Sequence, residues 1–389
     1  MGIVSNVDMW LCRPASFRQS AESKLSADRQ VRNWYREQQP SVIKSQPNGL
    51  YVGIGLTVLG IIAGFFKRWV GITIAAIGLV VGSYSKICCL GFNLIDMLNS
   101  KSIFNPQKDI EVAPENLGLN GEKVEIEHDG ETLRGYYIPA SKPTKKTVIY
   151  LHGRSNNVGH GLGVVKEFKK QLGDEVNYLV VDPRGYGEST FNSEQLTEKD
   201  AVSDVVAMYD YLVREKGCGG SDISIFGHSL GGAMAAFAAK ELDNENKLYR
   251  SAVIQGSFAS LKEVADEYIY GVFPDYLAEI LPKVVSYPWI AKILQKTVPY
   301  VLGFISKKLN KNDFNTLKII GDIKGKVLIC HSKTDQYIPF KQAERLKAAA
   351  PDAELVAQEE GAHGDFAKPE FMNEEYISAR RKHFGIDEG

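Results

Sequence analysis

The chain has 389 residues, a formal net charge of −1 and 44% hydrophobic side chains, which is enough for one large domain and an additional segment. Its near-neutral balance excludes a global electrostatic field that would attract nucleic acid or an acidic partner. The five cysteines have neither zinc-finger nor redox spacing, which excludes a recognisable disulfide framework.

The first 95 residues divide into a polar part and a hydrophobic part. Residues 1–49 are weakly basic, with seven Lys or Arg against four Asp or Glu. Residues 50–95 contain two apolar runs separated by residues 67–69, and the second run reaches full length only by including one lysine. A membrane-spanning helix needs about 20 apolar residues. We therefore predict a membrane hairpin over 50–95 and a linker over 96–122; burial of both runs in a soluble core is the alternative.

A hairpin returns the chain to the side of the membrane on which it started. Because positive residues favour the cytoplasmic side, the basic leader predicts that the N-terminus and the domain after residue 122 face the cytoplasm. Lys67 and Arg68 oppose this orientation, and a hairpin that crosses only part of the bilayer would remove the conflict. The expected partner of residues 50–95 is the lipid bilayer.

From residue 123 to residue 389, predicted strands and helices alternate. The first two strands have an Asp129-Gly130 turn between them, which is typical of a β-hairpin. Later apolar runs alternate with helical periodicity, which favours a mostly parallel sheet covered on both faces. The predicted strands are 123–128, 132–139, 147–151, 178–181, 222–226, 250–255, 327–330 and 354–357, and a helix is predicted over 203–216.

Residues 227–231 form a Gly-His-Ser-Leu-Gly pentapeptide between a predicted strand and a predicted helix. This context is typical of a nucleophile elbow, in which glycines permit a strained turn and the serine projects from the edge of the sheet. Ser229 is therefore the nucleophile candidate, and a purely structural turn is the alternative. A serine hydroxyl is a weak nucleophile, so a base must accept its proton.

The region from about residue 123 to the C-terminus resembles the α/β-hydrolase superfamily. Besides the pentapeptide, the motifs that carry this resemblance are residues 152–153, 182–189, 331–339 and 361–364. The resemblance implies an α/β-hydrolase fold, with a mostly parallel sheet covered by helices. A hydrophobic segment before this domain is similar to that of several membrane-attached members. The layout of the whole chain also resembles an uncharacterised chlamydial 43 kDa protein family.

The resemblance implies a triad of Ser229, Asp335 and His363, in the chain order that this fold uses. His363 lies in a Gly-rich loop after a strand near the C-terminus, and it would accept the proton of the serine. Asp335 would orient the imidazole and stabilise its charged form. A turn aspartate that bonds its own backbone is the alternative for Asp335.

An oxyanion hole for this chemistry needs two backbone donors. The Leu230 N–H follows the nucleophile and is one candidate; Arg154 or Gly153, in the loop after residues 147–151, is the other. We expect no metal, because His331 and Asp335 share a loop without further ligands at suitable spacing. We also expect no other cofactor, because the Gly-rich residues 159–163 lack the strand-to-helix pattern that a phosphate or dinucleotide site requires.

Some seventy residues separate the predicted strands that end at residue 255 and begin at residue 327, far more than a βα connection needs. Their aromatic and aliphatic spacing, interrupted by prolines, predicts two or three amphipathic helices. The superfamily inserts its cap at this place. A helical cap over about 258–315 is therefore expected to cover Ser229 and line an acyl pocket, and simple core packing is the alternative.

Together these features predict a membrane-anchored serine hydrolase that cleaves acyl esters or thioesters through an acyl-enzyme intermediate. The anchor favours a lipid or an acylated protein as the substrate. Three alternatives stay open: an inactive hydrolase-fold scaffold, a protein that interacts with a host vacuole or inclusion membrane, and a peptidase of the same fold. The sequence indicates no nucleic-acid partner and leaves the oligomeric state open.

Overall fold

The computed structural model describes residues 104–109, 112–193, 196–267 and 313–387, all of which belong to one compact unit, Leu98–Gly389. The predicted polar leader 1–49, the hairpin 50–95, the start of the linker and most of the cap lie outside these residues. Within the described part of the chain, no helix has both the length and the hydropathy that a membrane span requires.

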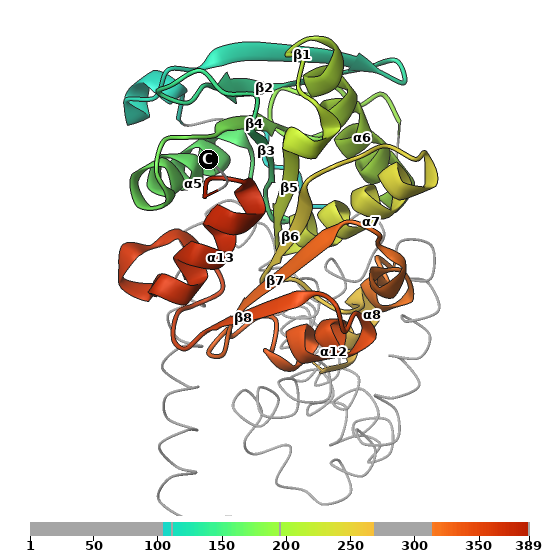
Figure 1. Ribbon diagram of the computed structural model, residues 1–389. Coiled ribbons are helices and arrows are strands. Elements are labelled where there is room, and N and C mark those ends of the chain that lie inside the picture. Colours follow the sequence, from blue (N-terminus) through green and yellow to red (C-terminus); the bar gives the residue numbers. More distant parts are fainter. Residues whose placement is uncertain (1–103, 110–111, 194–195, 268–312, 388–389) are drawn as a thin grey trace, which may run out of the picture. The chain divides into compact units, whose positions relative to one another are not determined.

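The centre of this unit is an eight-stranded sheet with the order β1-β2-β4-β3-β5-β6-β7-β8 (Figure 1). β2 is antiparallel to both of its neighbours and the remaining pairings are parallel, so β2 alone runs against the other strands. The strands are β1 Glu122–His128, β2 Glu131–Ile138, β3 Thr147–Leu151, β4 Asn177–Val181, β5 Ile223–His228, β6 Ser251–Gln255, β7 Lys326–Ser332 and β8 Glu354–Gln358. The mostly parallel sheet predicted from the sequence is confirmed.

The predicted hairpin is present, and its turn follows from two left-handed residues. Asp129 has φ 50° and Gly130 has φ 76°, which is the backbone that a two-residue hairpin turn needs. The register pairs His128 with Glu131 and Glu122 with Tyr137. By contrast, every residue of β3, β4, β5 and β6 is buried, as expected for parallel strands covered on both faces.

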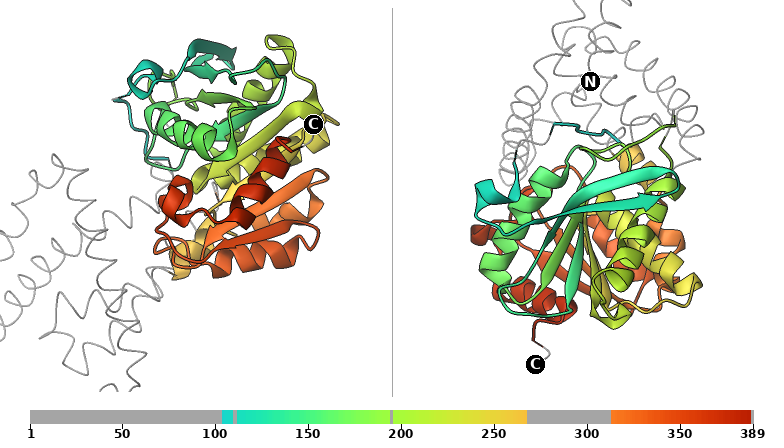
Figure 2. Two further views of the ribbon diagram at one scale, coloured as in Figure 1. Left: turned by 60° about the vertical axis from the view of Figure 1, so that its left-hand side comes forward. Right: turned by 90° about the horizontal axis from the view of Figure 1, so that it is seen from above.

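Helices cover both faces of the sheet (Figure 2). α5 (Val158–Leu172) and α13 (Glu374–Phe384) pack in one apolar cluster with residues of β3, β4 and β5. α6 (Glu198–Arg214), α7 (Leu230–Asn244) and α12 (Lys341–Ala349) pack on the other face. The short helices are α8 Leu261–Glu267, η2 Pro114–Leu117, η3 Gly220–Asp222, η5 Thr316–Lys318, η6 Ile320–Asp322, η7 Asp365–Ala367 and η8 Pro369–Phe371.

The structure corrects the sequence interpretation of the Gly-rich residues 159–163. They lie in the first turns of α5, shortly after β3, so a strand-to-helix context does exist there. Asn157 caps the helix by accepting a hydrogen bond from Gly159 N at 3.1 Å. A Cβ on Gly161 would lie 2.7 Å from Val180 Cγ1, so glycine permits close packing of α5 on the sheet. Tertiary packing here outweighs the low helix propensity of glycine.

Hydrogen bonds join the described residues before and after the segment 268–312. Leu261 N donates to Asp313 O at 3.2 Å, and the Ser260 hydroxyl donates to Asp313 Oδ1 at 3.4 Å. Leu317 N also donates to Ala259 O at 3.0 Å. The chain therefore leaves and re-enters the sheet domain at one place, beside the start of α8. The predicted cap itself lies outside the described residues.

Candidate active site

Ser229 occupies a strained turn between β5 and α7. Its φ of 57° and ψ of −120° are a conformation that non-glycine residues rarely adopt. The turn is held from outside, because Ser229 N donates to Gln255 O, at the end of β6, at 2.8 Å. Backbone strain of this kind costs about 1–3 kcal/mol and persists only where the surroundings enforce it.

The glycines on either side of Ser229 are required by space. A Cβ on Gly227 would lie 1.9 Å from Gly231 O, and a Cβ on Gly231 would lie 2.4 Å from Leu151 O. The first contact lets the turn close on itself, and the second lets α7 begin directly against the end of β3. The spacing predicted from the pentapeptide therefore has a steric cause in the folded chain.

Asp335 and His363 come together from two loops at the same edge of the sheet. Asp335 follows β7 and His363 follows β8, and these parallel strands are neighbours. His363 Nδ1 donates to Asp335 Oδ2 at 2.7 Å. Because Nδ1 carries the proton, Nε2 of His363 is the nitrogen that can accept one. The interaction is partly buried, with 14% of the His363 side chain and 2% of the Asp335 side chain exposed.

The Asp335 carboxylate is held in its charged form. Its Oδ1 accepts hydrogen bonds from Tyr337 N and Ile338 N, both at 2.8 Å. Burial alone would raise the pKa of Asp335, but the charge of His363 and hydrogen bonds from His331 and His363 outweigh it and hold the pKa well below its ordinary value. Asp335 is therefore also the turn aspartate that the sequence offered as the alternative. Its Oδ1 accepts from the backbone of the turn, and its Oδ2 accepts from His363.

His228, the residue before Ser229, connects the elbow to the loop of His363. Its Nε2 donates to the carbonyl oxygen of His363 at 2.9 Å, and the two ring centroids are 4.6 Å apart. Burial, and then the neighbouring His363, lower the pKa of His228 well below its ordinary value. Among the described residues, no hydrogen bond joins the Ser229 hydroxyl to the His363 ring. Such bonds are often long before substrate binds.

The two predicted oxyanion donors border the elbow. A Cβ on Gly153 would lie 3.3 Å from Ser229 Cβ, so the loop after β3 passes directly beside the serine. Leu230 is the first residue of α7, and its N–H belongs to the helix end that lacks intrahelical acceptors. Arg154 O accepts a hydrogen bond from Tyr186 Oη at 2.9 Å. Arg154 and Gly153 both stay candidates for the second donor.

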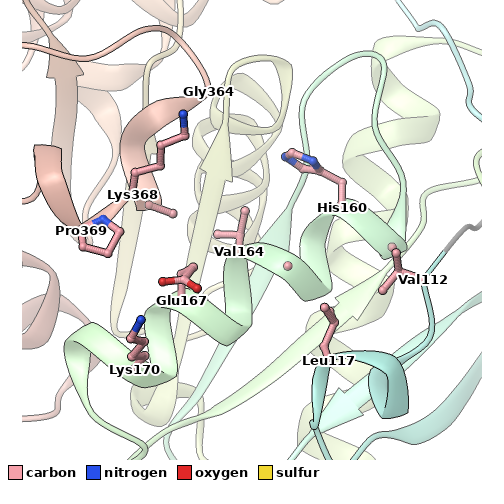
Figure 3. Close-up of a pocket in the computed structure, with 12 residues that line it drawn as sticks. Val112, Leu117, His160, Val164, Glu167, Lys170, Gly364, Lys368 and Pro369 are labelled. Atoms are coloured by element: carbon pink, nitrogen blue, oxygen red, sulfur yellow. The ribbon is translucent and has the colours of Figure 1, made fainter. Parts of the chain in front are cut away.

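A pocket of about 550 Å³ lies beside this site, between α5 and the turns that follow His363 (Figure 3). Its lining is largely apolar, and Glu167, Lys170 and Lys368 add charged groups. Gly364 is the lining residue nearest to the triad in sequence. The described residues that form the pocket include none of the three triad candidates, so we do not assign it as the site of bond cleavage. The residues that line the pocket are Val112, Leu117, Gly159, His160, Gly163, Val164, Glu167, Lys170, Gly364, Ala367, Lys368 and Pro369.

Two contacts near the elbow were not anticipated from the sequence. One is the bond from His228 to the His363 carbonyl, and the other is a buried pair between His152 and Asp182. In the sequence, the only signal for either histidine is its place inside a motif. In the part of the chain that the structure describes, no cluster of three or more His, Cys, Asp or Glu side chains could hold a metal ion.

Comparison with known families gives one match that covers more than half of the chain. Residues 142–370 match the family described as serine aminopeptidase, S33. Protein bem46 of Schizosaccharomyces pombe is 29% identical over 202 residues, which are 49% of this chain and 62% of that protein. The α/β-hydrolase domain-containing protein WAV2 of Arabidopsis thaliana is 25% identical over 311 residues, 78% of this chain and 89% of that protein.

The first curated relatives are longer than the region that they share with this chain. The chain spans 62% of bem46 and 3% of a multifunctional-autoprocessing repeats-in-toxin of Vibrio cholerae, in each case less than two thirds. Among solved structures, the esterase PF2001 of Pyrococcus furiosus superimposes with a TM-score of 0.51 and 21% identity, over 73% of this chain and 97% of that one. This likeness establishes the α/β-hydrolase fold. The resemblance to the chlamydial family is not supported by these matches.

Proposed function

Because the chain belongs to the serine aminopeptidase S33 family and is an α/β-hydrolase, we propose that it is a serine hydrolase that cleaves acyl esters or thioesters through Ser229. The observation that supports this most is the Asp335–His363 hydrogen bond at the sheet edge where the strained Ser229 turn also lies. In the neutral imidazole this arrangement puts the proton on Nδ1, so Nε2 is the nitrogen that can act as the base.

In the proposed reaction, the Ser229 oxygen attacks the substrate carbonyl while His363 Nε2 accepts the hydroxyl proton. The carbonyl oxygen becomes an oxyanion that accepts hydrogen bonds from Leu230 N–H and from Arg154 N–H or Gly153 N–H. His363 then gives its proton to the leaving alcohol or thiol as the carbon–heteroatom bond breaks. His363 next takes a proton from a water that attacks the acyl-enzyme carbonyl, and it returns this proton to the Ser229 oxygen as the acyl–oxygen bond breaks and the acid leaves.

Labelling with a fluorophosphonate probe tests the nucleophile directly. We expect the purified protein to be labelled at Ser229, because the probe reacts with a serine that has an active base, and we expect Ser229→Ala to show no labelling. Mass spectrometry of the labelled peptide locates the adduct. A protein with a normal circular dichroism spectrum that does not label, or labels equally as Ser229→Ala, would favour the inactive scaffold.

Lipids or acylated proteins are the substrates that we propose, and the support for them is the hydrophobic segment 50–95. If this segment is a membrane anchor, the full chain should stay in the membrane pellet after alkaline carbonate extraction. Deletion of residues 1–97 should move the protein to the soluble fraction without loss of probe labelling. Complete release of the full chain by carbonate would contradict integral insertion.

Peptide-bond cleavage is the second candidate, and the description of the matched family favours it. The two candidates share the acyl-enzyme chemistry, so labelling does not separate them. A panel of p-nitrophenyl esters of increasing chain length, acyl thioesters and aminoacyl anilides does. The proposed esterase should show a kcat/KM for its best ester well above that for any anilide, and the reverse order would favour the peptidase.

A further inference from the structure

The structure contains a second buried aspartate–histidine pair, Asp182–His152, at the loop that borders Ser229. We propose that this pair is a positioning device for the oxyanion hole: it holds the Gly153 carbonyl so that the Arg154 N–H of the same peptide faces the reacting carbonyl. This inference rests on the proposed function, because an oxyanion hole has meaning only for acyl transfer. It assigns roles to two residues outside the proposed triad.

The His152 ring makes a hydrogen bond to the carbonyl oxygen of the next residue, Gly153. His152 Nδ1 lies 2.8 Å from Gly153 O, and a carbonyl oxygen only accepts, so Nδ1 carries the proton. Gly153 O and Arg154 N–H belong to one planar trans peptide and point in opposite directions. Gly153 O also accepts from Asn156 N at 3.3 Å, so these two bonds together fix the carbonyl and with it the direction of the Arg154 N–H. Of the two donors that the sequence left open, we therefore assign this role to Arg154.

The other ring nitrogen of His152 shares a proton with the Asp182 carboxyl group. His152 Nε2 lies 3.1 Å from Asp182 Oδ1, and the two side chains are 4% and 0% exposed. One proton must lie between these atoms, either as Nε2–H donating to the carboxylate or as the carboxylic acid donating to Nε2. Burial raises the pKa of Asp182, and the partnership with His152 opposes that rise. In both forms Nδ1 keeps its proton and its bond to Gly153.

The next peptide of the loop is held as well. Arg154 O accepts from Tyr186 Oη at 2.9 Å and from Asn105 N at 3.3 Å. The Tyr186 ring also packs on the His152 ring, with centroids 4.9 Å apart. Tyr186 and Asp182 both come from the turn after β4, so one turn supports two consecutive carbonyls of the loop. A peptide fixed on both sides costs no reorganisation when the oxyanion forms, which is the property that an oxyanion hole needs.

The Asp335–His363 pair and the Asp182–His152 pair differ in which nitrogen faces the carboxylate. In the triad candidate, His363 presents Nδ1–H to Asp335, so its partner must accept. In the second pair, His152 presents Nε2 to Asp182 while Nδ1–H is committed to Gly153. An asparagine amide can donate to Nε2 and replace Asp182. The same substitution at the two sites should therefore have opposite consequences.

The experiment compares His152→Asn with His152→Phe. The asparagine amide nitrogen can occupy the place of Nδ1 and donate to Gly153, whereas phenylalanine fills the ring volume without a donor. We measure kcat and KM for p-nitrophenyl butyrate and the inhibition constant of a trifluoromethyl ketone, whose serine adduct carries an oxyanion. His152→Phe should lower kcat by up to about 100-fold, weaken the ketone by a similar factor and leave KM within about twofold. His152→Asn should keep at least a tenth of the wild-type kcat.

Equal losses in the two variants, a change in KM alone, or a loss of kcat without weaker ketone binding would overturn the inference. If His152→Phe does not fold, Asp182→Asn decides: retained kcat supports the proposal, and a loss as large as that of Asp335→Asn contradicts it. Fluorophosphonate labelling of the wild type distinguishes failure of this inference from failure of the proposed function. A wild-type protein that neither labels nor hydrolyses removes both proposals, whereas an active wild type with unaffected variants removes only this one.

Discussion

Ser229→Ala is expected to lower kcat for a p-nitrophenyl ester by about 10⁶-fold, which is the effect of removing the nucleophile from a serine triad. The rest of the site would stay in place, because the Asp335–His363 and His228–His363 hydrogen bonds do not involve the serine side chain. The measurement is single-turnover and steady-state hydrolysis at saturating substrate. Residual activity within about tenfold of wild type would show that another residue attacks the carbonyl.

The control for this variant uses the strain at the elbow. Alanine inherits the φ of 57° at residue 229, so Ser229→Ala should unfold at nearly the wild-type temperature. Ser229→Gly removes the same hydroxyl but tolerates that backbone, and it should be more stable than Ser229→Ala by about 1 kcal/mol. Chemical denaturation of both variants gives the comparison. Equal inactivity with different stability would separate the chemical role of the serine from its structural cost.

Asp335→Asn is expected to lower kcat by about 10⁴-fold with little change in KM. The amide can turn its NH₂ group toward His363, so that Nδ1 becomes the acceptor and the ring proton moves to Nε2. Nε2 then faces the serine as a donor and cannot accept the hydroxyl proton. In this orientation the amide oxygen takes the place of Oδ1 and still accepts from Tyr337 N and Ile338 N. The two backbone donors therefore favour the orientation that gives His363 the wrong tautomer.

Asp182→Asn is the matched control for Asp335→Asn. Both aspartates are buried and both contact a histidine, so a general effect of removing a buried charge would appear in both variants. The difference in kcat between the two variants therefore tests whether the partner of His363 must accept a hydrogen bond. A loss below about tenfold in Asp335→Asn would contradict the role that we propose for this carboxylate.

The sequence was sufficient for the parts of the fold that local pattern determines. The buried runs that became β3 to β8, the Asp129-Gly130 turn and the alternation of helices are each visible in a short window of residues. The order of motifs also placed Ser229, Asp335 and His363 on loops that the fold brings to one edge of the sheet. Their catalytic roles stay predictions, because geometry alone does not measure turnover.

Other features depend on contacts between residues far apart in the chain, and local pattern could not reveal them. The start of α5 does not stand out in the sequence because its glycines have low helix propensity, and the close approach of Gly161 to Val180 exists only in the folded chain. His152 and Asp182 are thirty residues apart, and nothing in either motif shows that their side chains meet. The structure was needed to show which nitrogen each histidine commits to its partner.

The fastening of Leu261 to Asp313 has an evolutionary consequence. Since the chain departs from the sheet and rejoins it at one point, the residues between these anchors can change in number and composition at little thermodynamic expense; doubling a loop costs only about 0.6 kcal/mol. Related chains could therefore diverge in this segment while the strands that present Ser229 and Asp335 stay constant. Substrate preference and chemical machinery would then be free to evolve at different rates.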